Sequence, residues 1–378
     1  MKRSFSHILF LFLLPALLSS CTNQESAEPG LKDALEGKFY MGAALNGPQI
    51  TGEDTMAVKV LKEHFNSITA ENIMKSESIQ PAEGEFDFSM ADRFVEFGEA
   101  NDMYIVGHCL VWHSQTPDWF FTDSSGKTVS REVMIERMKN HIQTFVSRYK
   151  GRVDCWDVVN EAILDDGSWR ESMFYKIIGE DFIKLAFQFA SEADPDADLL
   201  YNDYSMTNEG RRGTVIELVE DMKADGIKID GIGMQAHYGL DYPALEEFEK
   251  SILAFAATGV KVHITELDIS VLPSPWNRTG ANIADRAEYM EMMNPYPDAL
   301  PDSVSQGLND RYLDIFELLL KHQDIVERVT TWGVNDSQSW KNGWPIRGRT
   351  DYPLLFDRQF DPKPVVGKII ELAGSEAH

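Results

Sequence analysis

The sequence has few cysteines, little positive charge and a single long apolar run, and each scarcity excludes a class of protein. Three cysteines in 378 residues rule out a disulfide-rich scaffold. Cys109 and Cys155 both lie in apolar segments, where we expect reduced, structural thiols. Lysine and arginine number 35 against 61 acidic residues, so the net charge of −26 argues against nucleic acid as a partner. A neutral substrate is easier to reconcile with this charge.

The one long apolar run, Ile8 to Leu18, follows two basic residues at the N-terminus. It is too short to span a bilayer and fits the hydrophobic region of a signal peptide. Small residues directly before Cys21 resemble a bacterial lipobox, so we expect residues 1–20 to be a lipoprotein signal peptide and Cys21 to be lipidated. An ordinary secretory signal with an incidental cysteine is the alternative. Residues 21–34 then form a flexible tether.

The predicted lipid places the protein in the cell envelope. Thr22, the residue after the cysteine, is not the aspartate of an inner-membrane signal, which by analogy favours the outer membrane. No later segment is long and apolar enough to span a membrane. We therefore expect a membrane contact through the N-terminal lipid alone, and a monomer.

The sequence also has no internal repeat, no low-complexity region and no glycine-rich phosphate loop after an early strand, which argues against an open dinucleotide-binding sheet. Strand-like runs alternate instead with amphipathic stretches. The predicted strands are Phe39–Leu45, Ser67–Ala70, Tyr104–Trp112, Val153–Asn160, Asp198–Tyr204, Gly231–His237, Lys261–Ile269 and Val329–Asp336. The predicted helices include Arg131–Tyr149, Ser172–Ala193, Thr214–Asp225, Tyr242–Ala257 and Asn309–Lys321. Eight such units predict an α/β fold, a (β/α)8 TIM barrel that forms a single catalytic domain over residues 35–374.

Polar residues with catalytic potential gather where these strands end, whereas the first halves of the strands are mostly apolar. They are Glu71, Asn72, Lys75, His108, Trp112, His113, Asn160, Glu161, Asn202, Asp203, Tyr204, Gln235, His237, Glu266, Asp268, Trp332, Asp336 and Trp340. The carboxyl ends of barrel strands share one face, so this pattern predicts a site at the barrel mouth. Asn160 and Glu161 are neighbours and would point apart on a regular strand. Both reach the site only if the strand ends or bulges there.

Two glutamates from different strands, with Trp, Asn, Gln and His around them, suit glycoside hydrolysis. The leaving sugar oxygen needs a proton, and the anomeric carbon needs a nucleophile or an activated water. Tryptophan rings fit the apolar faces of sugars, and the polar side chains can hydrogen-bond sugar hydroxyls. Sequence alone leaves retention and inversion open, because the distance between the carboxyl groups decides between them.

Several segments resemble glycoside hydrolase family 10, whose members are mostly endo-β-1,4-xylanases. They are Trp156–Glu161, Ile264–Asp268, Thr69–Asn72 with Met74 and Lys75, His108–Gln115, Trp332–Asp336 with Trp340, and Pro353–Asp357. The resemblance spans roughly residues 35 to 370, with one motif on each strand and in order. It implies a retaining endo-β-1,4-xylanase that hydrolyses xylan or xylo-oligosaccharides without a cofactor.

The resemblance also implies residue roles. Glu161 would be the general acid/base and Glu266 the nucleophile. Glu71, Asn72, Lys75 and Trp112 would serve the distal glycone sugar, while His108, Asn160, Gln235 and His237 would surround the sugar being cleaved. Asp268 would orient His237, with His113 in a supporting role. Trp332 and Trp340 would wall the glycone side, and Tyr204 would stack on the aglycone side.

Three alternatives stay open. The same machinery could act on another β-1,4-glucan, or the chain could be a catalytically inactive glycan-binding lipoprotein. His108, His113 and His237 could suggest zinc, but tetrahedral ligand spacing is absent, so we expect no metal. Two departures from the family also bear on substrate binding. Ser205 stands where the family often has Asn, and Leu272 to Gly307 is expected to be a long irregular insertion after strand seven.

Overall fold

A computed structural model of the protein describes residues 29–274 and 292–375. The predicted signal peptide, Cys21 and most of the tether therefore lie outside the described residues, as does the middle of the predicted insertion. Within the described ranges, no helix combines the length and the apolar character needed to cross a membrane. Cys109 and Cys155 are both buried and free, as expected.

The strands form one parallel sheet that closes on itself. Its order is β6-β5-β4-β3-β2-β1-β9-β8-β7, and β6 also pairs with β8, which completes the ring. The bounds are β1 Tyr40–Leu45, β2 Ser67–Ala70, β3 Tyr104–Trp112, β4 Cys155–Asn160, β5 Asp198–Asp203, β6 Gly231–Met234, β7 His237–Gly239, β8 Lys261–Ser270 and β9 Val326–Thr331. β7 is a short continuation of β6. The predicted (β/α)8 barrel is confirmed.

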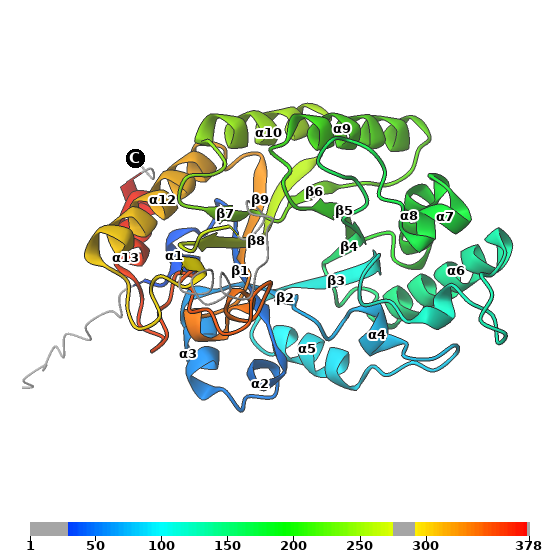
Figure 1. The fold of residues 1–378 in the computed structure, drawn as a ribbon, viewed down its shortest axis with the longest axis horizontal. Coiled ribbons are helices and arrows are strands. Elements are labelled where there is room, and N and C mark those ends of the chain that lie inside the picture. The colour runs from blue at the N-terminus through cyan, green and yellow to red at the C-terminus, as the bar shows by residue number, and fades with distance from the viewer. Residues whose placement is uncertain (1–28, 275–291, 376–378) are drawn as a thin grey trace, which may run out of the picture.

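Helices surround the strands on all sides (Figure 1). Their bounds are α1 Leu31–Ala34, α2 Gly47–Ile50, α3 Thr55–His64, α4 Ser76–Ile79, α5 Ser89–Glu99, α6 Arg131–Arg148, α7 Met173–Ile178, α8 Asp181–Ala193, α9 Glu209–Ala224, α10 Leu245–Ala257, α12 Asp302–Lys321 and α13 Pro364–Ser375. Several begin at a capping side chain, which satisfies a backbone N–H that the first helical turn leaves open. Asp54 accepts from Ala57 N at the start of α3, and Ser172 accepts from Tyr175 N at the start of α7.

Some predicted boundaries were wrong, each for a local reason. The helix predicted over 172–193 is two helices, because Gly179 has φ +89° and ends α7. The strand predicted over 231–237 is interrupted after Met234, and Ala236 takes φ +61° before β7 begins. The strand predicted over 329–336 begins three residues earlier, at Val326, and ends at Thr331. Part of the predicted insertion is helical, since α12 begins at Asp302.

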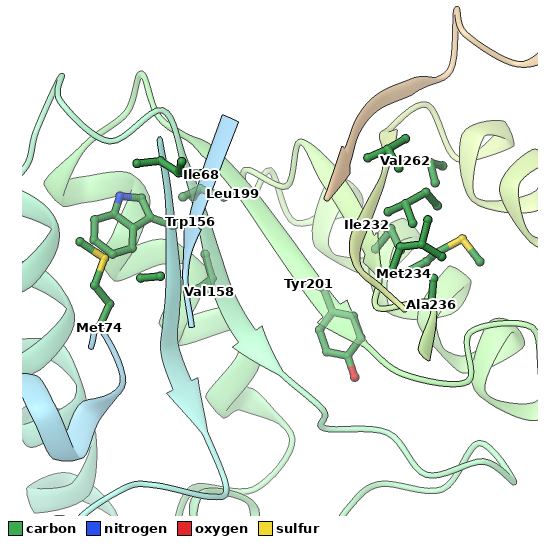
Figure 2. Packing of buried hydrophobic residues seen from close by; sticks show 14 of the residues in the cluster. Ile68, Met74, Trp156, Val158, Leu199, Tyr201, Ile232, Met234, Ala236 and Val262 are labelled. Carbon is green, nitrogen blue, oxygen red and sulfur yellow. The ribbon is translucent and has the colours of Figure 1, made fainter. Parts of the chain in front are cut away.

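The main apolar core lies between the strands and the surrounding helices. Trp156 on β4 is fully buried and packs edge-to-face on Phe145 of α6, with 4.9 Å between the ring centroids. Figure 2 shows Trp156 beside Met74, and Ile232 with Met234 near Val262 farther round the barrel. This packing holds the strands in place, and the polar residues at their carboxyl ends then face one common mouth.

Candidate active site

Glu161 lies directly after β4 and adopts a left-handed backbone conformation, with φ +60°. Its backbone N–H donates to Asn202 O over 2.9 Å, and its carbonyl accepts from Arg170 Nε over 2.7 Å. A left-handed conformation at a non-glycine residue costs about 1–3 kcal/mol and persists only where its surroundings hold it. The strand thus ends at Asn160, and the two neighbouring side chains both reach the site. This resolves the conflict that strict alternation predicted.

Glu266 lies on β8 and is almost fully buried, with 4% of the residue exposed. Its Oε1 accepts a hydrogen bond from Asn202 Nδ2 over 2.8 Å, and its Oε2 lies 3.2 Å from His237 Nε2. Thr265, the preceding residue, donates to Asn202 Oδ1 over 2.6 Å. Two consecutive residues therefore contact the same side chain, which the irregular pairing of β8 with β9 at this point permits.

Side-chain amides connect the two glutamates. Gln235 Nε2 donates to Glu161 Oε1 over 3.0 Å and lies 3.2 Å from Asn160 Oδ1. Asn202 Nδ2 donates to the same Asn160 oxygen over 3.0 Å as well as to Glu266. The carboxyl groups of Glu161 and Glu266 therefore share one network of neutral donors, built from four strands or strand ends. Such a network fixes their orientation without adding charge.

His237 and Asp268 set the electrostatics around Glu266. His237 Nδ1 lies 3.0 Å from Asp268 Oδ2, and Lys341 Nζ lies 3.1 Å from Asp268 Oδ1. Burial alone lowers the pKa of His237, but the charge of Asp268 and hydrogen bonds to Asp268 and Glu266 outweigh it and raise the pKa to about 9. Burial alone raises the pKa of Glu266, yet the hydrogen bond from His237 and the fields of His108 and His237 hold it below its usual value. Glu266 is therefore ionised at neutral pH.

Glu71, Asn72, Lys75 and Trp112 form a second polar group at the mouth. Lys75 Nζ donates to Asn72 Oδ1 over 2.8 Å and lies 4.7 Å from the centroid of the Trp112 ring. Burial raises the pKa of Glu71 against the opposing charge of Lys75. The structure thus brings these four predicted residues together. They offer hydrogen-bond donors and acceptors beside an aromatic ring, as a sugar site requires.

Trp332 and Trp340 stand beside the histidines. The Trp332 ring meets His108 edge-on at 5.2 Å between centroids, and the Trp340 ring lies 5.0 Å from that of His237. Trp340 Nε1 donates to Asp268 Oδ2 over 2.8 Å, which fixes the plane of its ring. The Trp344 ring stacks on the Trp340 ring, with 5.1 Å between the centroids, and Lys341 Nζ lies 5.0 Å from the Trp340 centroid. A shallow recess next to this stack is lined by Tyr242, Ser270, Leu272, Pro273, Ser274, Trp340, Lys341, Trp344, Pro345 and Arg349.

Tyr204 and His113 lie on the Glu161 side of the mouth. Tyr204 OH accepts from Arg170 Nη2 over 2.7 Å, and the guanidinium carbon of Arg211 lies 4.1 Å from the ring centroid. His113 Nδ1 is 4.0 Å from Glu161 Oε2. Burial and the charge of Arg170 lower the pKa of His113 against the opposing charge of Glu161. A neutral imidazole therefore stands beside the Glu161 carboxyl group at neutral pH.

Two strand-end carboxylates belong to the scaffold of the barrel. Asp336 is fully buried, with Oδ2 2.8 Å from Lys363 Nζ, and it accepts a hydrogen bond from Leu354 N. Asp203 is also fully buried and accepts from Tyr201 OH over 2.6 Å. Burial raises the pKa of Asp203 to about 7 and that of Asp336 to about 6. Both carboxylates are thus held by scaffold partners, although Asp203 is close enough to Glu161 for the charge of Glu161 to raise its pKa further.

The structure adds residues that the predicted site omitted. Asn202 was recognised as a polar strand end, but its link to Glu266 was not predicted. Asp157 lies inside a recognised motif and its Oδ2 is 2.8 Å from His108 Nδ1. Arg170 follows no strand and carries no strand-end signal, so only the folded loop places it beside Glu161 and Tyr204. Among the described residues, His, Cys, Asp and Glu side chains form no group of three suited to a metal ion.

Comparisons with known proteins show which proteins the chain is similar to. Residues 30–372 match the profile of Glycosyl hydrolase family 10. The chain is 50% identical over 372 residues to endo-1,4-beta-xylanase A of Xylanibacter ruminicola, covering 98% of this chain and all of that protein. It is 41% identical to an endo-1,4-beta-xylanase of Geobacillus stearothermophilus, covering 92% of this chain and 99% of that one. A solved GH10 endoxylanase from a sugarcane soil metagenome superposes with a TM-score of 0.86 at 45% identity, covering 92% of this chain and all of that one.

Proposed function

The chain belongs to glycosyl hydrolase family 10, and we propose that it is an endo-β-1,4-xylanase that cleaves internal bonds of xylan with retention of configuration. The single observation that carries the proposal is the pair of glutamates at the barrel mouth. Glu266 is buried and ionised, and Glu161 joins it through the amides of Asn160, Asn202 and Gln235. Two carboxyl groups with distinct surroundings can take the distinct roles that glycoside hydrolysis needs.

In the first step, Glu266 attacks the anomeric carbon while Glu161 donates its proton to the glycosidic oxygen. The bond between the carbon and that oxygen breaks, and an ester to Glu266 forms. Glu266 suits this role because its ionised form is stabilised by His237 Nε2 and Asn202 Nδ2. Glu161 has the larger exposed fraction, 15% of its side chain against 6% for Glu266, as befits a group that meets the leaving sugar and later water.

In the second step, water attacks the ester from the side that the leaving sugar has vacated. Glu161, now a carboxylate, accepts a proton from that water, and Glu266 leaves as a carboxylate. Both substitutions invert the anomeric carbon, so the net result is retention. Proton NMR of a fresh hydrolysis should show the β-anomer of the reducing end before mutarotation. An initial α-anomer would disprove the double displacement.

The remaining mouth residues bind the sugars on either side of the cleaved bond. Glu71, Asn72, Lys75 and Trp112 hold the distal glycone sugar, because they place charged and amide groups beside one aromatic ring. His108, Asn160, Gln235 and His237 surround the sugar at the cleavage point, and Asp268 orients His237. Trp332 and Trp340 wall this side, and Tyr204 stacks on the leaving sugar. These roles are proposals for the residues of this chain.

Xylose lacks the hydroxymethyl group of glucose. The preference of the enzyme for xylose over glucose units can therefore be tested with two substrates that differ in this group. A groove that fits xylose closely rejects glucose because the extra group clashes with its wall. We expect an aryl β-xylobioside to be hydrolysed with kcat/KM on the order of 10²-fold above that of the aryl β-cellobioside. Equal values would assign the chain to a broader β-1,4-glycanase. Xylan binding without release of reducing ends would leave it a glycan-binding protein.

We further propose that the enzyme is held in the cell envelope, in the outer membrane, by a lipid on Cys21. The apolar N-terminal run and the small residues before Cys21 support this. The net charge of −26 argues against attachment by electrostatic attraction to anionic lipids. Cys21→Ser should move the enzyme from the membrane fraction to the soluble fraction and abolish incorporation of labelled palmitate. Labelling and fractionation that stay unchanged would contradict the anchor.

A further inference from the structure

Arg170 lies in the active site because the loop that follows β4 folds back on itself like a hairpin. Ile163 and Trp169 pair in an antiparallel bridge, and Leu164 N donates to Ser168 O over 2.8 Å. Gly167 takes φ +87° at the turn, a conformation that glycine adopts at low cost. Arg170 N then donates to Ala162 O over 2.8 Å. Although they are nine positions apart in the chain, Arg170 therefore lies beside Glu161.

The Arg170 side chain makes two short hydrogen bonds to two elements of the site. Nε donates to Glu161 O and Nη2 donates to Tyr204 OH, each over 2.7 Å. The guanidinium is planar and rigid, so its two donors keep a fixed separation and direction. One side chain thus fixes the backbone of Glu161 relative to the ring of Tyr204.

Tyr204 is also held from its other side. Arg211 is fully buried, its guanidinium carbon lies 4.1 Å from the ring centroid, and its Nη1 donates to Tyr204 O. One face of the ring is therefore covered by Arg211, and a sugar can stack only on the opposite face. Arg170 at the phenol oxygen then sets the direction in which that face points.

The backbone of Glu161 depends on its hydrogen bonds, because φ +60° is an unfavourable conformation for this residue. Its N–H is held by Asn202 O and its carbonyl by Arg170 Nε. The carboxyl group has a separate partner, Gln235 Nε2. Loss of Arg170 therefore removes one of the two backbone restraints on Glu161 while leaving the nucleophile and its partners untouched.

On the basis of the proposed xylanase function, we propose that Arg170 is a positioning residue that couples proton donation by Glu161 to binding of the leaving sugar on Tyr204. The sugar that stacks on Tyr204 carries the oxygen that Glu161 protonates. As the bond from the anomeric carbon to that oxygen breaks, the proton passes from Glu161 to the oxygen and the carbon bonds to Glu266. Arg170 makes both contacts converge on the same oxygen.

The test compares leaving groups, because a good leaving group needs no proton. For Arg170→Met we expect kcat/KM for phenyl β-xylobioside to fall by on the order of 10²-fold, the size of a general-acid contribution. The value for 2,4-dinitrophenyl β-xylobioside should change by less than about threefold, since kcat/KM reports only the first bond cleavage. Arg170→Lys should restore part of the phenyl activity. Xylohexaose should also lose activity, because its leaving sugar stacks on Tyr204 and its glycosidic oxygen needs the proton from Glu161.

Tyr204→Phe distinguishes the effect of Arg170 on sugar binding at Tyr204 from its effect on proton donation by Glu161. It removes the oxygen that Arg170 holds and keeps the ring, so it should raise KM for xylohexaose and leave the phenyl to dinitrophenyl ratio nearly unchanged. Arg148→Met is the matched control, because Arg148 makes a comparable two-point contact with Asp92 on the outer surface. It should leave all these ratios unchanged.

Equal losses on phenyl and dinitrophenyl substrates, or no loss on either, would overturn the role of Arg170. If Arg170→Met does not fold, the same ratio in Arg170→Lys decides. A failure of the proposed xylanase function would be detected in a different measurement, because the unmodified enzyme would then release no reducing ends from xylan.

Discussion

Asn202 Nδ2 lies 2.8 Å from Glu266 Oε1 and 3.0 Å from Asn160 Oδ1. One amide group therefore contacts the nucleophile directly and is linked to Glu161 through Asn160 and Gln235. Its orientation is fixed by Thr265, which donates to Asn202 Oδ1 over 2.6 Å. The amide is fully buried. It can therefore stabilise the Glu266 carboxylate without competition from water.

Removal of this amide should weaken the nucleophile. For Asn202→Ala we expect kcat/KM to fall by on the order of 10²-fold, the usual cost of losing one preorganised donor. The hydrogen bond from Asn202 lowers the pKa of Glu266, so the acid limb of the kcat/KM profile should move to higher pH. Asn66→Ala, which removes an amide that caps the opposite end of the barrel at Met41 N, should leave that limb in place. An unmoved limb in Asn202→Ala would contradict this role.

Replacement of the nucleophile gives a chemical test of its identity. Glu266→Ala should lower kcat by on the order of 10⁴-fold or more, because a covalent step is lost. The melting temperature should stay close to that of the unmodified enzyme. Azide should restore turnover of 2,4-dinitrophenyl β-xylobioside and give the α-glycosyl azide, since a small anion can enter from the vacated side. Substantial activity without azide would remove Glu266 from the role.

The pKa of His237, about 9, depends on its charged neighbours. Asp268→Asn removes the charge that raises this pKa, so an NMR titration of the His237 imidazole should give a pKa lower by roughly one to two units. Lys341→Met removes a charge that lowers it, so the imidazole should titrate at higher pH. Shifts of the same sign in both variants would show that other groups control the titration of His237.

The same group links stability to pH. The folded pKa of His237, about 9, lies above its ordinary value of 6.5, so its contribution is complete below pH 6.5 and is lost as the pH rises through 9. The contribution amounts to about 3 kcal/mol at most. Thermal unfolding at pH 6 and pH 10 should therefore show a smaller loss of melting temperature in His237→Asn than in the unmodified enzyme. Equal losses of melting temperature in the two proteins would show that groups other than His237 cause the destabilisation at alkaline pH.

Two glycines should respond in opposite directions to alanine. A Cβ on Gly107 would meet the Trp156 ring at 2.2 Å, so Gly107→Ala should destabilise the barrel by about 1–3 kcal/mol. Gly213 lies in the exposed part of α9 with open space around it, so Gly213→Ala should stabilise by about 0.5–1 kcal/mol. Melting temperatures measured side by side check both signs. A stabilised Gly107→Ala would mean that Trp156 can repack.

The sequence by itself determined the chemistry and the order of the elements. Strand-like runs that alternate with amphipathic stretches predicted eight strands, and the bounds of β2 and β3 agree with the prediction to the residue. Strand-end polar residues such as Glu161 and Glu266 were identifiable because parallel strands of a barrel present their carboxyl ends on one face. These signals depend only on residues close together in the chain, so the amino-acid sequence of one protein is enough to identify them.

Tertiary structure alone decided how these residues meet. The left-handed backbone of Glu161, the link between Asn202 and Glu266 and the return of Arg170 to Tyr204 all depend on partners distant in the chain. Asn202 and Glu266 are 64 positions apart, and no periodicity in either segment encodes their 2.8 Å contact. Local propensity favours regular strands and disfavours φ +60° at glutamate, so only the energy of packing and hydrogen bonding across the closed barrel can impose that geometry.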